Sequence, residues 1–163
     1  MKRSSDSVLA KGLQAGFATT GTVHHVARGS FALNSTDVSL SETGAAYSDQ
    51  WMMKRVGGGQ EIACSGTDVS TRVYAGGIIA PEKLSALGIT EAQVLGYLKK
   101  YLSQYAGTTR LHEPVASVPD GDWHYRYTIM KDYPDIPLTI GIETIMYKGN
   151  EVFIHVFLVT PVA

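Results

Sequence analysis

The sequence predicts an α+β fold in which an antiparallel, mostly meandering β-sheet packs against one long amphipathic helix, with further short helices. Apolar residues recur at helical spacing in the middle of the chain, and apolar and polar residues alternate on both sides of that segment. A glycine-containing turn separates the last two apolar runs. Because 163 residues fit one domain, we expect a single α+β domain over 1–163, in which 1–19 forms a short helix or a loosely attached segment.

The long helix is predicted over residues 90–106. Thr90 and Gln93 have the spacing of a capping box, in which each side chain bonds the backbone N–H of the other residue. Gly107 follows the segment and is typical of a helix end. The side chains that recur at helical spacing should form one buried stripe: Val94, Tyr97, Leu98, Tyr101, Leu102 and Tyr105.

Two shorter helices are also expected. One begins at Pro81, which suits the first helical position, and ends at Gly88. The other covers residues 5–17 with Ser7 as its cap, although two internal glycines weaken it. Its apolar residues recur every four positions: Leu9, Leu13 and Phe17.

Residues 20–75 are predicted to form β-strands because their apolar and polar side chains alternate. Within this part, residues 51–56 are expected to pair with residues 61–65. The turn between them is assigned to Gly57-Gly58-Gly59, since glycine adopts positive φ at little cost.

The last third of the chain is predicted to be β-structure as well. Residues 138–147 and 152–159 are expected to form a hairpin. Gly149-Asn150 is assigned as its type II′ turn, which would place Lys148 opposite Glu151 as a cross-strand ion pair.

Both faces of that predicted hairpin are apolar. In this register the first face, with Phe153 and His155, packs on the helix. The second face needs another cover, either a different part of the chain or another molecule, because one helix stripe covers only one face. On this ground we predict a binding surface, for a protein partner or a second copy of the chain, from the second face: Glu143, Ile145, Tyr147, Val152, Ile154 and Val156.

Acid–base chemistry is the alternative use of the same region, and its candidates are His155, Glu143 and His124. Glu143 stands out because it lies in a strongly apolar strand, where a buried charge needs a partner. Arg126, on a neighbouring predicted strand, is one such partner.

Neither a reactive cysteine nor a metal site is predicted. Cys64 is the single cysteine and ends a strand, so it is interpreted as a structural side chain. His24 and His25 are adjacent, so on a strand they point to opposite faces and cannot bind one ion together. We therefore predict no metal and no cofactor.

Charge and hydropathy exclude two classes of partner. The 14 basic and 15 acidic residues are nearly balanced and show no basic cluster of the kind that binds nucleic acid. No apolar run approaches the roughly 20 residues of a membrane span. We expect a soluble, cytoplasmic protein, while a periplasmic or secreted location after processing stays open.

Because no catalytic motif is present, the leading expectation is a binding protein: an interaction, inhibitor or immunity-type module that uses an apolar sheet face or cleft. A small enzyme with an acid–base site between sheet and helix is the second alternative. A non-catalytic carrier of a small apolar ligand is the third. An open cavity with paired polar groups would favour the enzyme or the carrier over the interaction protein.

Overall fold

The computed structural model describes residues 3–17, 22–40, 44–116 and 119–162. Its helices and strands, in chain order, are α1 (Ser4–Ala15), β1 (His24–Arg28), β2 (Phe31–Leu40), β3 (Ala45–Met53), β4 (Val56–Ser65), β5 (Asp68–Ile78), α2 (Pro81–Ala86), α3 (Glu91–Tyr105), β6 (Trp123–Tyr133), β7 (Leu138–Tyr147) and β8 (Asn150–Val162).

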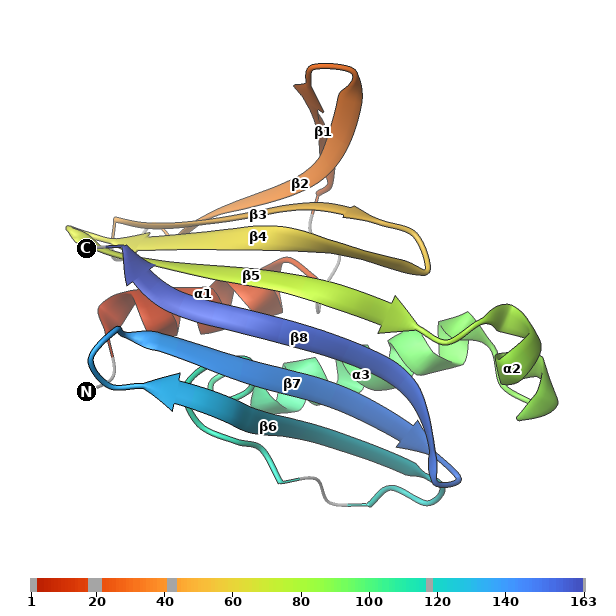
Figure 1. The fold of residues 1–163 in the computed structure, drawn as a ribbon. Helices are drawn as coiled ribbons and strands as arrows, with labels where there is room; N and C mark the ends of the chain where they lie inside the picture. The colour runs from red at the N-terminus through yellow and green to blue at the C-terminus, as the bar shows by residue number, and fades with distance from the viewer. Residues whose placement is uncertain (1–2, 18–21, 41–43, 117–118, 163) are drawn as a thin grey trace.

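The eight strands form one antiparallel sheet in the order β1-β2-β3-β4-β5-β8-β7-β6. Strands β1 to β5 make one meander, and β6 to β8 make a second one (Figure 1). Pairing between β5 and β8 joins the two meanders into a continuous sheet. The expected α+β class with an antiparallel sheet is therefore present.

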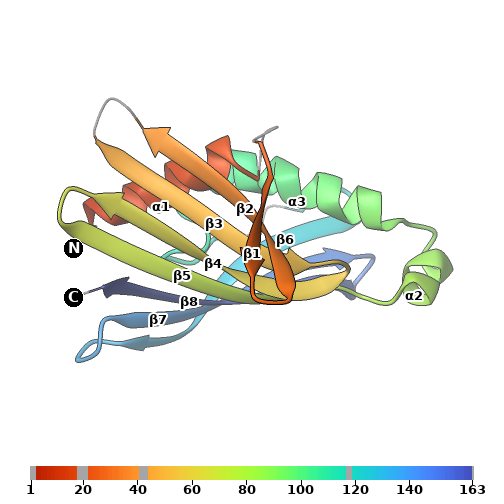
Figure 2. The same cartoon turned by 90° about the horizontal axis from the view of Figure 1, so that it is seen from above.

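Helices α1 and α3 lie on the same face of the sheet, and the opposite face carries no described helix (Figure 2). We call the helix-covered side the inner face and the other side the outer face. The expectation of one helix against the sheet is incomplete, because α1 also buries apolar side chains, with Leu9 and Leu13 almost fully enclosed. No described helix combines the length and the apolar character that a membrane crossing requires.

Helix α3 begins as its sequence predicts. The Gln93 backbone N–H donates to the Thr90 hydroxyl at 3.3 Å, and the Thr90 backbone N–H donates to the Gln93 side chain at 2.8 Å. The stripe is buried against the sheet at Val94, Tyr97, Leu98, Tyr101 and Leu102.

Helix α1 is capped by Arg3 and not by Ser7, which lies inside the helix. Its Gly12 has a packing role, since a Cβ there would lie 2.1 Å from the Tyr47 ring. Phe17 follows the helix and remains 38% exposed. The absent side chain at Gly12 thus lets α1 lie directly on strand β3.

The predicted glycine turn is wrong. Gly57, Gly58 and Gly59 lie within β4, and the residues that connect β3 to β4 are Lys54 and Arg55. A Cβ at Gly59 would lie 2.5 Å from the Tyr74 hydroxyl oxygen. Gly59 therefore gives the Tyr74 side chain room over the sheet, a long-range requirement that local turn chemistry does not reveal.

The predicted register of the last hairpin is also wrong. Tyr147 pairs with Asn150, so the turn residues are Lys148 and Gly149, both with positive φ as in a type I′ turn. A β-bulge between Ile145 and Met146 shifts the pairing again. The expected Lys148–Glu151 pair does not form, and the Lys148 ammonium lies 3.8 Å from the Asp122 carboxylate.

The corrected register redistributes the hairpin residues between the two faces. Toward the helices, β7 residues of the second predicted face pair with β8 residues of the first predicted face: Gly141, Glu143 and Ile145 with Phe157, His155 and Phe153. Away from the helices lie Ile140, Ile142 and Thr144 with Leu158, Val156 and Ile154. Each predicted face thus mixes residues from both sides of the real sheet.

Candidate functional site

The candidate acid–base residues lie in different surroundings. Glu143 and His155 are register partners on the inner face, and both are buried. His124 is exposed on the edge strand β6, on the opposite face of the sheet. The structure therefore brings Glu143 and His155 together but leaves His124 apart from them.

Glu143 is held in a buried ion pair. Its carboxylate accepts hydrogen bonds from Arg110 Nε at 3.0 Å and Nη2 at 2.6 Å, and from the Tyr125 hydroxyl at 2.6 Å. The prediction of Arg126 as the partner is wrong. Arg126 follows Tyr125 on the strand, so its exposed side chain points to the outer face. Because Arg110 and Tyr125 already donate to both carboxylate oxygens, we interpret Glu143 as a structural carboxylate.

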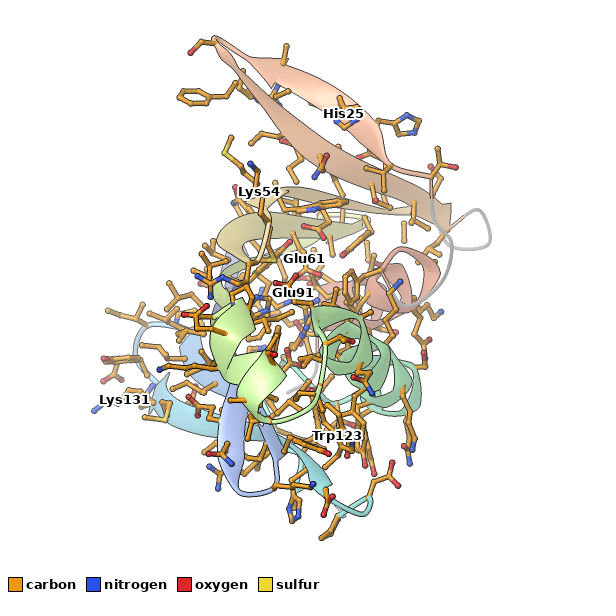
Figure 3. The ribbon with its side chains drawn as sticks, turned by 90° about the vertical axis from the view of Figure 1, so that its right-hand side faces the viewer. His25, Lys54, Glu61, Glu91, Trp123 and Lys131 are labelled. Carbon is orange, nitrogen blue, oxygen red and sulfur yellow. The ribbon has the colours of Figure 1, made fainter. Side chains whose placement is uncertain are left out.

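A second buried ion pair joins the first. Arg72 binds Glu61, whose carboxylate also accepts from the Tyr47 hydroxyl at 2.7 Å. Arg72 Nη1 donates to the Arg110 carbonyl at 3.0 Å, and both guanidinium groups lie over the Phe157 ring, at 5.9 and 4.8 Å. Glu61 lies between the sheet and the helices (Figure 3). Burial alone would raise the pKa of Glu61. The charge and hydrogen bonds of Arg72, the Arg110 charge and the Tyr47 hydroxyl together outweigh burial and lower that pKa.

Arg110 has a left-handed backbone with φ of 62°, which non-glycine residues rarely adopt. Its side chain binds Glu143 and its carbonyl binds Arg72, so two separate contacts hold the conformation. We call Glu61, Arg72, Arg110 and Glu143 the buried ion-pair network.

His155 is 5% exposed, and neither ring nitrogen has a hydrogen-bond partner among the described residues. Its ring packs on Phe153 at 4.5 Å and on Tyr74 at 5.6 Å between centroids. Burial, helped by the Arg110 charge, lowers the pKa of His155 to about 4. The imidazole is therefore neutral at physiological pH.

Asp49 is the perturbed acid that the sequence analysis missed. It lies on β3, and the Tyr74 hydroxyl donates to its carboxylate at 3.0 Å. Burial first, and the Glu61 charge second, raise the pKa of Asp49 to about 7. Asp49 is half-buried, so it can exchange protons near neutral pH. The sequence signal that could have identified Asp49 is its acidic side chain at an inward position of a strand with alternating residues.

The predicted binding residues divide between the faces because the hairpin register differs by one residue. Ile145 and Val152 are fully buried core residues, as is Glu143. Tyr147 packs its ring on Trp123 at 4.6 Å on the inner face. Ile154 and Val156 lie on the outer face, where no described helix covers them.

A pocket with converging polar groups lies at the opposite end of the sheet from the Lys148-Gly149 turn. Its volume is about 370 Å³, within the range of small-molecule sites. We call it the His112 pocket. Its walls come from α1, the segment after α3, and strands β6, β7 and β8: Arg3, Asp6, Gly107, Thr108, Leu111, His112, Glu113, Asp132, Tyr133, Pro134, Pro137, Thr139 and Pro161.

A chain of polar contacts crosses this pocket. The Thr139 hydroxyl donates to Asp132 Oδ1 at 2.9 Å, so its lone pair accepts from His112 Nδ1 at 2.7 Å. His112 Nε2 faces Asp6 Oδ2 at 3.6 Å. Burial alone would raise the pKa of Asp6, but the His112 side chain and the Arg3 backbone N–H outweigh it and lower that pKa.

Metal-ligand geometry is absent from the part of the chain that is described, where no three His, Cys, Asp or Glu side chains converge on one point. His25 lies with His24 on β1, in the hairpin that projects from the rest of the sheet (Figure 3). Cys64 is half-buried on the outer face of β4.

Comparison with protein-family models, with curated proteins and with solved structures finds no match for this chain. The pocket residues also escaped the sequence analysis. Asp6, His112, Asp132 and Thr139 come from four separate segments, and none forms a recognisable motif with its neighbours.

Proposed function

We propose that this chain is a binding protein and that the His112 pocket takes a small organic cation, such as an alkylammonium group. One observation carries the proposal: two carboxylates of the pocket, Asp132 and Glu113, form no ion pair with any described residue. A cationic ligand would supply the missing charge.

The other charged groups of the pocket are already engaged. The Arg3 guanidinium lies 3.4 Å from the Asp68 carboxylate, which is not part of the pocket wall. Asp6 accepts from the Arg3 backbone N–H at 3.0 Å and faces His112. An anionic ligand would therefore meet three carboxylates and no unpaired cation, which disfavours it.

The walls of the pocket suit the carbon skeleton of such a ligand. Proline rings and Leu111 supply apolar surface, and Tyr133 supplies an aromatic ring. The Lys131 ammonium lies 5.2 Å from the Tyr133 ring centroid, so this ring already contacts one ammonium group. An alkylammonium would place its charge at Asp132 and Glu113 and its chain against the prolines.

Isothermal titration calorimetry with butylammonium, and with butyrate as the oppositely charged probe, tests the proposal. We expect the native protein to bind butylammonium and not butyrate. The Glu113→Gln/Asp132→Asn double variant should bind at least about tenfold more weakly, which corresponds to about 1.4 kcal/mol. Each amide keeps an oxygen acceptor, so the Thr139 hydrogen bond survives.

Glu151→Gln is the matched control, because Glu151 is an exposed carboxylate at the other end of the sheet. It should bind butylammonium like the native protein. Equal affinity for both probes, or an unchanged affinity in the double variant, would show that the pocket does not select a cation.

Acid–base catalysis at Asp49 is a second candidate function. The favouring observation is a carboxyl group whose pKa of about 7 allows it to give and take protons at neutral pH.

Carbon-13 NMR titration of the Asp49 carboxyl should show a midpoint near 7. Tyr74→Phe should raise it further, because the Tyr74 hydroxyl stabilises the ionised form. A midpoint in the ordinary range of an aspartate would remove this candidate.

A further inference from the structure

The outer face of four adjacent strands carries one charged side chain, Glu151, at the turn end of β8 where it pairs with Met146. The other outward positions of β4, β5, β8 and β7 include Val56, Gly58, Gln60, Ile62, Cys64, Val69, Thr71, Val73, Ala75, Gly77, Ile154, Val156, Leu158, Thr160, Val162, Ile140, Ile142, Thr144 and Met146. Several of these are well exposed, including Ile62 and Val73 at 41% and Leu158 at 40%.

An antiparallel sheet with one face in water normally alternates apolar and polar residues. On the outer face of β5, β7 and β8 this pattern is absent, because the outward residues are mainly apolar. Val73 and Ile140 both pair with Leu158, and Ala75 and Ile142 both pair with Val156, so the apolar side chains form continuous rows across three strands. Contiguous apolar surface of this kind marks an interface in most proteins.

We infer that the outer face is an interface between two copies of this chain, packed sheet to sheet around a two-fold axis. The inference goes beyond the cation site and does not depend on it, since the His112 pocket opens at the end of the sheet and not on this face. Two sheets in such an arrangement lie about 10 Å apart and interdigitate their side chains.

The scarcity of charge favours a second copy as the occupant. In a two-fold interface the same patch meets itself, so every charge near the axis would approach a like charge. The patch of β4, β5, β8 and β7 limits this repulsion, because its one charged outward side chain is Glu151, at the turn end of β8.

The charges at the two rims of the patch fit the same symmetry. On one side, β6 presents the outward, exposed residues Arg126 and Lys131. On the other side, β2 presents the outward, exposed Asp37, and Arg28 of β1 donates to Gln50 on the same face at 3.3 Å. A two-fold axis parallel to the strands places β6 of one copy over the β2–β3 side of its partner, so Asp37 approaches the basic residues of β6 at each rim.

The available area is sufficient for a stable dimer. Ten residues of a strand span about 33 Å, and six neighbouring strands span about 29 Å, which gives the face from β3 to β6 roughly 950 Å². A standard interface buries about 800 Å² on each partner. The patch also has a hollow of about 350 Å³ lined by Val56, Gly77 and Ile154 among others, which can accept a partner's side chain.

Sedimentation equilibrium and light scattering test the inference on the full chain. The native protein should have twice the monomer mass of 17.6 kDa. Val156→Lys, in the middle of the patch, should weaken the dimer at least tenfold while circular dichroism and the melting transition show a folded monomer. Leu95→Lys is the matched control, since Leu95 on α3 has the same 38% exposure as Val156. It should remain a dimer.

Cys64 provides a second measurement that needs no substitution, because it lies on the outer face of β4. Its rate of labelling by a thiol reagent should fall as the protein concentration rises and the dimer forms. A native protein that is monomeric at every concentration, with a constant labelling rate, would overturn the inference. So would a folded Val156→Lys variant that remains a dimer. If Val156→Lys does not fold, the concentration dependence of Cys64 labelling decides.

Discussion

His155 combines deep burial with two ring nitrogens that have no partner among the described residues. An unsatisfied buried polar group costs about 1–3 kcal/mol of folding free energy. The surrounding rings of Tyr74, Phe153 and Phe157 offer only aromatic contacts. At this position an aromatic residue without nitrogen therefore suits the protein fold better than histidine does.

His155→Phe should raise the free energy of unfolding at pH 7 by about 1 kcal/mol, because it removes the unpaired nitrogens. It should also change the pH dependence. The pKa of His155 is about 4 in the folded protein and lies below its ordinary value of 6.5. The unfolded chain thus binds a proton between these values that the folded protein does not, and native stability falls as pH drops from 6.5 to 4. The variant should lose less stability in that range.

Urea unfolding of the native protein and the variant at pH 7, 5.5 and 4.5 measures both effects. His124→Phe is the control, because His124 is exposed and its replacement should leave the native pH dependence in place. A His155→Phe variant that is less stable at pH 7 would mean that the imidazole has a bonding partner in solution.

At the scale of single elements, α3 is the clearest case of a structure that local sequence specifies. Its capping box and its apolar period both depend on residues within one or two turns of each other. The predicted helix over 90–106 accordingly agrees with α3 (Glu91–Tyr105).

Leu98→Ala should lower the free energy of unfolding by about 2–5 kcal/mol, because Leu98 is 1% exposed and its loss leaves a cavity. Leu95→Ala, on the solvent side of the same helix, should cost much less. Chemical denaturation of both variants gives the comparison. Equal effects of the two substitutions would contradict the assignment of Leu98 to the buried side of α3 and Leu95 to its solvent side.

The last hairpin shows where local sequence fails. Gly149 indicated the turn correctly, but the sequence did not show whether glycine takes the first or the second turn position. The bulge at Ile145 and Met146 added another shift. Since side chains alternate between faces, one residue of register moves a whole strand to the other side. The strands were therefore predictable, whereas the faces that define a binding surface were not.

At the scale of the whole molecule, the unpredicted contacts join segments far apart in sequence. Arg110 reaches Glu143, and Asp6 faces His112, only because the sheet and helices bring these segments together. The sequence did identify Glu143 as a charge that needs a partner. It could not identify Arg110, because no periodic pattern surrounds that residue.

The strand order has a consequence for protein synthesis. β8 follows all other described strands in the chain, yet it lies between β5 and β7. As the chain leaves the ribosome from its N-terminus, β5 exposes an unpaired, apolar edge while α2, α3, β6 and β7 are made. Exposed edges of this kind pair readily with other chains. A nascent protein stalled before β8 would therefore be the form most prone to aggregate and most in need of a chaperone.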